Sequence, residues 1–262
     1  MALGGGSMSP FSDEADVLKL IKMISNREGL GDLLAEGSAR AAQTIGGEAL
    51  RYSMTVKSNE MTAFEARSQT NLALGFATAA VGPRYEICEH DWDFDTRVGW
   101  SHTLDYCRTI GILNRIPMEH LGKDKVSNFK ALSTLWSAAD GLGICLFATA
   151  PTRVYSLEEM ARLVRIVTGW ETSAYEVMRV GQLRYHLFRF YNYREGLSAA
   201  DDTLPDRFFE EAIDFGTHKG VKINREKFYE AIALYYDMMG WDETGKPKES
   251  TLYDFCLGWL CE

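Results

Sequence analysis

The clearest secondary-structure signal in the chain lies in residues 156–170, SLEEMARLVRIVTGW, and residues 173–183, SAYEVMRVGQL. Each segment begins with a serine followed three positions later by a glutamate, the spacing of a capping box at a helix N-terminus. In each, apolar residues then recur every three to four positions, as they do on the buried face of a helix. The two segments therefore predict two consecutive amphipathic helices.

The helical period continues on both sides of these segments, and glycines mark several of the expected helix ends. Only one stretch alternates as a strand does, and it predicts a short strand at residues 51–57. The expected fold is therefore all-α, with at most a short strand or hairpin. The other helices are predicted at residues 17–24, 30–45, 72–80 and 228–239.

Composition and charge exclude several classes of function. The chain has 262 residues, 46% of them hydrophobic, and its 28 basic against 37 acidic side chains give a formal charge of −9. A surface this negative repels phosphate backbones and anionic lipid, so we expect no nucleic-acid and no membrane partner. No apolar run approaches the roughly 18 residues of a membrane span. Five cysteines without a CxxC pair predict a reducing, cytoplasmic location.

The pattern of linkers predicts how the chain is divided. Residues 1–8, MALGGGSM, are expected to be a tag with a Gly/Ser linker. Residues 86–100, EICEHDWDFDTRVGW, are acidic, aromatic and irregular, and they suggest a junction between two domains. We accordingly expect one domain at residues 9–95 and a helical domain at residues 96–262.

The string DGLGIC at residues 140–145 is the most suggestive site motif. Its glycines, Gly141 and Gly143, allow close approach of the backbone to a ligand or a sharp turn at a helix end. Asp140 can accept hydrogen bonds, and Cys145 can supply a thiolate to iron, although a cluster normally takes four. Taken alone, the string is more typical of a helix C-terminus with a buried cysteine.

Other candidate residues are weaker. None of the five histidines has zinc-site spacing, and His120, His186 and His218 are expected to have ordinary structural roles, the last two at a helix surface or core edge. His90, in the cluster Glu-His-Asp, could be oriented by carboxylates or could lie in a solvated loop. The carboxylates at Asp91 and Asp93, and those at 201–202, are expected to solvate loops. The basic and aromatic stretch 184–194 is expected to form the edge of a packed core.

Eight strings, read together and in order, resemble the tungsten-containing aldehyde:ferredoxin oxidoreductase family in its C-terminal, helical part. Single strings are weak, but all eight occur in the family's order and cover nearly all of residues 13–258. They are REGLGDLLAEG at 27–37, VK and EMTAFEAR at 56–67, LGFAT at 74–78, DGLGIC at 140–145, VTGW at 167–170, NYREG at 192–196, DDTLPDRF at 201–208, and YY with GWD at 235–242.

The resemblance implies two packed helical subdomains and a redox chemistry. In this family a tungsten or molybdenum ion on two pterins lies beside a [4Fe–4S] cluster. Residues Asp140, Gly141, Leu142, Gly143 and Ile144 match the stretch that binds one pterin, and Cys145 matches a cluster ligand. Ferredoxin is the implied electron partner, and a small aldehyde or acid is the implied substrate. The resemblance leaves open whether the protein forms a homo-oligomer.

This sequence departs from the family in three places. At the second pterin-binding stretch the usual Asp-Pro-Arg-Gly is Glu-Ala-Arg-Ser, so that Glu65 and Arg67 are the cofactor-binding candidates there. After residue 78 the usual Asn-Arg-Gly string is missing, which suggests a different substrate range. The family's catalytic histidine has no clear counterpart, and His90 and His102 are candidates by location.

The larger gap lies at the front of the chain. The CxxCxxxC triplet that holds three of the four cluster irons in the family, and the cofactor-covering domain around it, are missing. We therefore expect the chain to be the C-terminal part of an enzyme that converts aldehydes to carboxylic acids or the reverse, with the isolated chain inactive. The pterin–metal group and the cluster are expected only in the full-length protein. The alternatives are a non-catalytic helical scaffold or binding module, and a benzoyl-CoA-reductase-type member.

Overall fold

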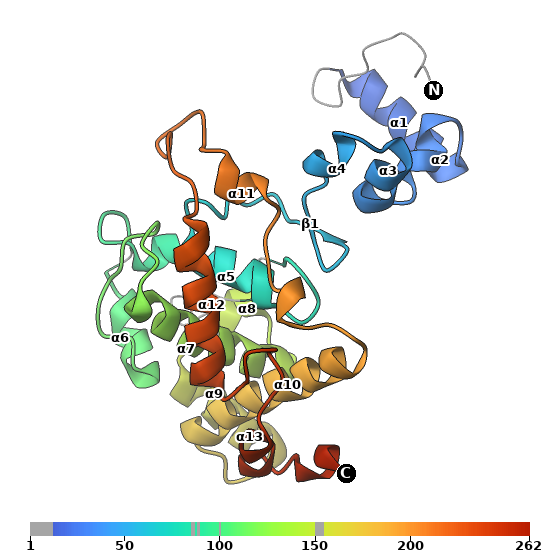
Figure 1. The fold of residues 1–262 in the computed structure, drawn as a ribbon. Coiled ribbons are helices and arrows are strands. Elements are labelled where there is room, and N and C mark those ends of the chain that lie inside the picture. The colour runs from blue at the N-terminus through green and yellow to red at the C-terminus, as the bar shows by residue number, and fades with distance from the viewer. Residues whose placement is uncertain (1–12, 85–86, 88–89, 100, 150–154) are drawn as a thin grey trace.

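The computed structural model describes residues 13–84, 87, 90–99, 101–149 and 155–262. The expected tag at residues 1–8 lies outside this range. Within it the chain is helical, with one two-stranded antiparallel hairpin, as predicted (Figure 1). The elements are α1 Glu14–Asn26, α2 Leu30–Leu34, α3 Ser38–Ile45, α4 Ala49–Tyr52, β1 Thr55–Val56, β2 Asn59–Glu60, α5 Thr70–Thr78, η2 Asp91–Phe94, α6 Thr103–Cys107, η3 Arg108–Ile110, α7 Lys123–Gly141, α8 Leu146–Thr149, α9 Leu157–Thr168, α10 Ala174–Arg194, η4 Ala199–Asp201, α11 Arg207–Glu210, α12 Arg225–Met239, α13 Glu249–Asp254 and η5 Gly258–Cys261.

Local signals placed most of the long helices correctly. Ser156 and Ser173 both form complete capping boxes, at the starts of α9 and α10. Gly240 ends α12 in the left-handed conformation, which a glycine adopts without strain. Helix α1 covers its predicted segment 17–24, whereas α5 ends at Thr78, two residues before the predicted end at residue 80.

Two predicted elements were wrong in detail. The segment 30–45 forms two helices, α2 and α3, because Gly37 adopts a φ of 85° that ends one helix before the next begins. The predicted strand 51–57 is shorter, because its first residues belong to α4. Of the predicted strand, only Thr55 and Val56 form a strand, β1, which pairs with β2 in the register Thr55↔Glu60. The positive φ values of Lys57 and Ser58 turn the chain from β1 into β2.

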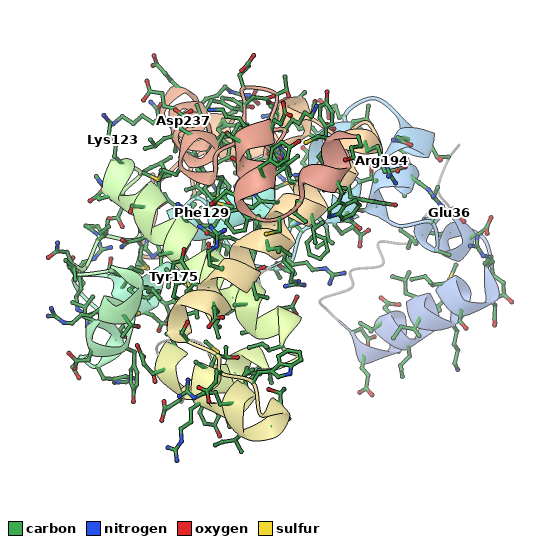
Figure 2. All side chains as sticks on the ribbon, turned by 90° about the horizontal axis from the view of Figure 1, so that it is seen from below. Glu36, Lys123, Phe129, Tyr175, Arg194 and Asp237 are labelled. Atoms are coloured by element: carbon green, nitrogen blue, oxygen red, sulfur yellow. The ribbon has the colours of Figure 1, made fainter. Side chains whose placement is uncertain are left out.

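Helices α7, α10 and α12 form the centre of the molecule. Phe129 of α7, labelled in Figure 2, is 1% exposed. Its ring centroid lies 5.0 Å from that of Tyr235 of α12. Helix α10 crosses α7 closely at Gly181, where a Cβ atom would stand 2.2 Å from the carbonyl oxygen of Thr134. The contact therefore requires a glycine.

The N-terminal helices α1 to α4 are grouped apart from this centre, on the far side of the β1–β2 hairpin (Figure 1). None of the residues of α1 is buried, and Leu18 and Ile21 on its apolar face are 51% and 56% exposed. Helix α1 packs mainly on α2, where Gly31 lies directly against the backbone of Met23. The main hydrophobic core, by contrast, contains residues from both sides of position 95, such as Phe76 and Phe228. The 95/96 domain boundary itself stays a prediction.

The carboxylate of Asp202 is fully buried and gathers three polar side chains around it. Lys57 forms an ion pair with Oδ1 at 2.7 Å, and Arg189 forms one with Oδ2 at 2.6 Å. The Tyr236 hydroxyl donates to Oδ2 at 2.5 Å, and burial together with the Asp202 charge raises the pKa of this tyrosine. This Asp202 cluster joins the hairpin, α10 and α12.

Several acidic residues expected in solvated loops are buried instead, so this prediction was wrong. Asp202 belongs to the cluster just described, and Asp93 is 1% exposed. Asp91 is also buried, where it pairs with Lys125 and accepts a hydrogen bond from the backbone N–H of Asn71 at 2.9 Å. Burial raises the pKa of Asp91, against the opposing effect of Lys125.

His186 was expected at a helix surface or core edge, but it is 1% exposed. Its Nδ1 accepts a hydrogen bond from the indole N–H of Trp241 at 3.0 Å. Burial, helped by the nearby charges of Arg179 and Lys130, lowers the pKa of His186 to about 4.

No helix among the described residues is long and apolar enough to cross a bilayer.

Replacing Asp202 by asparagine keeps the shape of the side chain and removes its charge. Lys57 and Arg189 are then buried without compensation, and breaking a buried ion pair in this way costs about 3 to 5 kcal/mol. We expect urea unfolding, followed by circular dichroism, to show a loss of this size in the free energy of unfolding. Asp237→Asn, at an exposed site on α12, is the matched control. A loss no larger than that of the control would contradict the stabilising role of the cluster.

In the His186→Gln variant, the free energy of unfolding should depend less on pH than in the unmodified chain. The folded-state pKa of about 4 lies below that of unfolded histidine, about 6.5, so the contribution of neutral His186 is complete above pH 6.5 and declines as the pH falls toward 4. Between pH 7.5 and 4.5 this decline amounts to about 2 kcal/mol. Urea unfolding of both proteins at the two pH values measures it. Parallel losses in the two proteins would rule out His186 as the origin.

Candidate functional site

The string 140–145 forms the C-terminal end of α7, as its glycines allow. The N–H of Ile144 donates to the carbonyl of Ala139 at 3.0 Å, and Gly143 has a φ of 70°. A Cβ atom at Gly143 would have no neighbour within 4 Å, so the backbone is open on this side. Cys145 is exposed, contrary to the alternative of a buried cysteine. The string is thus both a helix end and an exposed strip, which we call the 140–145 strip.

Asp140 is held at the surface by an arginine from the neighbouring helix. Its side chain is 75% exposed and pairs with the guanidinium of Arg184, on α10. Arg184 also donates to the carbonyl of Ser137 at 2.7 Å. At Gly141 a Cβ atom would lie 2.9 Å from Cδ of Arg184, so this glycine leaves room for the arginine. Sequence reasoning missed Arg184, because its contact with Asp140 is set by helix packing rather than by spacing.

The second predicted cofactor stretch is occupied by its own contacts. Oε1 and Oε2 of Glu65 accept hydrogen bonds from Arg67 Nε at 2.8 Å and Nη2 at 2.6 Å. Nη1 of Arg67 donates to the carbonyl of Glu211 at 2.8 Å. Burial raises the pKa of Glu65, but the hydrogen bonds from Arg67 outweigh it and leave the pKa below its usual value. This stretch therefore fits a cofactor less well than the 140–145 strip does.

The two candidate catalytic histidines lie in different surroundings. His90 is 7% exposed and packs edge-on against Phe64, with 4.9 Å between ring centroids. His102 is exposed at the start of α6, 6.2 Å from the ring of Tyr106. His102 is exposed to solvent, whereas His90 is enclosed. Their catalytic roles stay predictions.

No three His, Cys, Asp or Glu side chains of the described residues gather into a site that could hold a metal ion. The residues predicted to bind a cofactor here lie on one side only. They are Asp140 with its exposed carboxylate, Gly143 with its open backbone, and Cys145, which is an exposed residue. Such a set can cover a group held mainly from the opposite side.

Comparison with known proteins identifies the family of this chain. The family model described as "Aldehyde ferredoxin oxidoreductase, domains 2 & 3" matches residues 3–257. The chain belongs to the aldehyde ferredoxin oxidoreductase family. The chain is 32% identical, over 234 residues, to the tungsten-containing aldehyde ferredoxin oxidoreductase of Pyrococcus furiosus, and 28% identical, over 261 residues, to that of Pyrococcus horikoshii. These alignments cover 87% and 97% of this chain but 34% and 39% of the relatives' length.

Two further similar proteins have different names. An aliphatic sulfonate oxidoreductase subunit of Pyrococcus furiosus, described as WOR-like, is 26% identical over 261 residues, which is 95% of this chain and 35% of that protein. Among solved structures, the BamBC active-site complex of benzoyl coenzyme A reductase, with bound 1,5-dienoyl-CoA, superposes with a TM-score of 0.68. It covers 97% of this chain and 41% of that chain at 19% identity, which supports the shared fold.

If the 140–145 strip serves binding rather than folding, Asp140→Asn should leave stability almost unchanged. Ion pairs this exposed contribute less than about 1 kcal/mol, in contrast with the buried Asp202 cluster. Urea unfolding of the variant beside the unmodified chain measures the difference. A loss above about 2 kcal/mol would show that Asp140 has a mainly structural role.

Proposed function

We propose that this chain is the C-terminal helical part of a cytoplasmic tungstopterin oxidoreductase that interconverts aldehydes and carboxylic acids, with ferredoxin as electron partner. Family membership supports the redox class, and the relatives that are named for tungsten support the metal. The observation that carries the proposal is the exposed 140–145 strip, where Asp140 and Cys145 stand at the surface beside the open backbone of Gly143.

Each residue of the strip would have a separate task. The carboxylate of Asp140, oriented by Arg184, would accept hydrogen bonds from the pterin's N–H groups. Gly141 and Gly143 would let the backbone, with Leu142 and Ile144, approach the pterin closely. The thiolate of Cys145 would complete the ligands of an iron–sulfur cluster, which normally takes four. When bound, the metal–pterin group supplies two-electron redox chemistry, and the cluster supplies a path for single electrons.

The remaining candidates have less direct tasks. Arg67 would steady the second pterin only after some of its contacts with Glu65 are exchanged, because those contacts already use its donors. His102, which is exposed, would be better placed than the enclosed His90 to move a proton to or from a bound substrate.

The chain spans 34 to 39% of the length of the Pyrococcus relatives, so it represents part of their architecture. A cofactor covered on one side only would stay open to water, and one thiolate would not retain a cluster. We therefore expect this chain alone to be inactive, and its activity to require an N-terminal cofactor-binding domain.

Anaerobic analysis for tungsten, molybdenum, iron and acid-labile sulfide tests this function, together with aldehyde oxidation coupled to a viologen dye. We expect no stoichiometric metal and no turnover for the 262-residue chain, and both for a longer protein that includes the cofactor domain. In that longer protein, Asp140→Ala and Cys145→Ala should lower the metal content, whereas Asp237→Ala should not. Stoichiometric metal in the 262-residue chain, or a longer protein without metal, would contradict the proposal.

A further inference from the structure

Helices α1 to α4, residues 14–52, form an arm that takes no part in the hydrophobic cores of the rest of the molecule, which we call the body. Among the described residues, none of the core side chains, and none of the partly buried side chains packed against them, precedes Met54. Within the arm itself, Gly31, Ala41 and Ala42 are the buried residues of the four helices. Burial of apolar surface is the main force in folding, so other contacts have to hold the arm in place.

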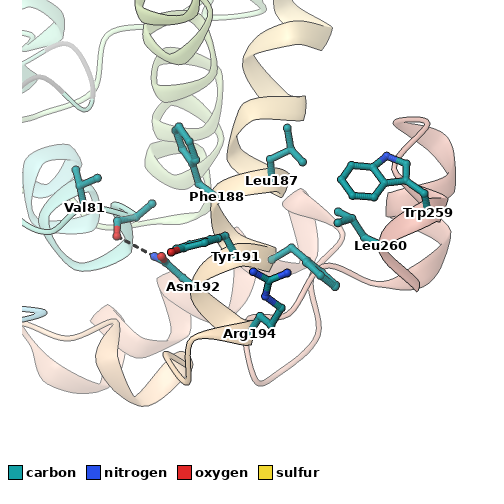
Figure 3. A pocket seen from close by; sticks show the side chains of 10 residues that line it. Val81, Leu187, Phe188, Tyr191, Asn192, Arg194, Trp259 and Leu260 are labelled. Carbon is teal, nitrogen blue, oxygen red and sulfur yellow. Dashed lines mark hydrogen bonds between the residues drawn. The ribbon is translucent and has the colours of Figure 1, made fainter. Parts of the chain in front are cut away.

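The C-terminal segment, which is also peripheral, is held in a different way. Leu252, Phe255 and Leu257 form a small hydrophobic core, against which Leu187 of α10 and Leu260 of η5 pack. The groove beside this contact, of about 560 Å³, is apolar, and its walls include Leu187 and Leu260 (Figure 3). Apolar packing thus fixes the C-terminal segment on α10, whereas the described residues of the arm have no such contact with the body.

The arm is attached to the body by an ion-pair junction at Glu211, the residue that follows α11. Nε and Nη2 of Arg51, on α4, donate to Oε1 of Glu211 at 3.1 and 2.7 Å. Nε of Arg207, on α11, donates to Oε2 at 2.9 Å. Hydrogen bonds from Arg207 and Arg51 lower the pKa of Glu211 to about 2, so the carboxylate is charged at neutral pH. We call these three side chains the Glu211 latch.

The other contacts between arm and body are also polar. The guanidinium group of Arg207 lies over the ring of Tyr52, 5.1 Å from its centroid. On the hairpin, Glu60 accepts a hydrogen bond from the backbone N–H of Ser38, at the start of α3. Apart from the connecting residues 53–54, the hydrogen bonds and ion pairs that join the described residues of the arm to the body are those of Arg51 and Ser38.

A polar cavity of about 650 Å³ lies between the arm and the body, beside the latch. Leu50 and Arg51 of α4 form one wall, and Thr203, Arg225 and Tyr229 of the body form another. Leu50 is 54% exposed although it lines this cavity. The face between arm and body is therefore polar and open to solvent instead of packed.

The latch itself is exposed, and this sets its strength. The side chains of Arg51 and Glu211 are 51% and 32% exposed. An exposed ion pair shifts an equilibrium by about five-fold or less, and salt screens it. Beyond the arm, strand β1 is fixed in the body, because Val56 belongs to the main core and Lys57 pairs with Asp202. Residues 53–54, between α4 and β1, are thus the place where the arm can turn.

We propose that helices α1 to α4 pivot as one arm about residues 53–54, and that the Glu211 latch closes the arm on the body at low ionic strength and releases it as the ionic strength rises. Closure forms the polar cavity, and release opens it. Release also breaks the exposed contact between Ser38 and Glu60. The latch uses no residue of the 140–145 strip, so the proposal is independent of bound cofactor and of the proposed redox function.

Single-molecule fluorescence energy transfer in the 262-residue chain measures the position of the arm. Dyes are attached through non-canonical amino acids at positions 19, on α1, and 222, before α12, which are both exposed. This chemistry leaves the exposed cysteines unlabelled. Arg51→Gln breaks the latch, and Glu211→Gln removes the acceptor of both latch arginines. Arg40→Gln is the matched control, because Arg40 is an exposed arginine whose partner, Glu36, lies within the arm.

We expect the transfer efficiency of the unmodified chain to fall as NaCl rises from about 0.01 M to about 1 M, over which the Debye length falls from about 30 to about 3 Å. At low salt, Arg51→Gln should raise the ratio of open to closed arm about five-fold, and Glu211→Gln should raise it by at least as much. Arg40→Gln should behave as the unmodified chain does. Circular dichroism checks that each variant keeps its helices.

A transfer efficiency that does not change with salt, or equal efficiencies for Arg51→Gln and Arg40→Gln at low salt, would overturn the proposal. The salt titration uses the unmodified chain, so it decides the matter even if a variant folds poorly. None of these results depends on metal content or turnover, so the redox function is tested separately.

Discussion

The buried carboxylate of Asp202 is the point at which the distant parts of this fold are held together. Lys57 reaches it from the hairpin, Arg189 from α10 and Tyr236 from α12. Removing these charges from water costs free energy, and this cost is offset only when every partner is in place. An arrangement that misplaced the hairpin by one residue would leave a buried charge unpaired, so the cluster selects one arrangement of the helices.

A short stretch of chain connects the Asp202 cluster to the candidate site. The ammonium group of Lys57 also donates to the carbonyl of Ala77, near the end of α5, which fixes where that helix stops. The next residues form the loop that lies beside α10, and Val81 and Arg84 of this loop line a cavity together with Asp140 and Arg184. The Asp202 cluster therefore helps to position this loop beside the candidate site.

Local features of the fold could be predicted from the sequence, and long-range features could not. The capping boxes at Ser156 and Ser173 and the stop at Gly240 are contained within a few neighbouring residues, so their signals are complete in the sequence. Burial of Asp202 and His186 depends on helices far away along the chain, and an acidic pair in a polar loop looks the same whether it is solvated or enclosed. The 140–145 strip was predicted as a candidate site from its residues, whereas the contact of Arg184 with Asp140 is set by helix packing, which no spacing in the sequence indicates.

The two kinds of site in this molecule differ in how freely they can change over evolutionary time. The Asp202 cluster is enclosed and stabilises the fold, whereas the 140–145 strip stands at the surface. Substitutions at the surface have small effects on folding, so selection can alter them one at a time without first losing the protein. Such a scaffold can acquire new substrates by gradual drift, and the relatives named for aldehydes and for aliphatic sulfonates fit a lineage that has diversified in this way.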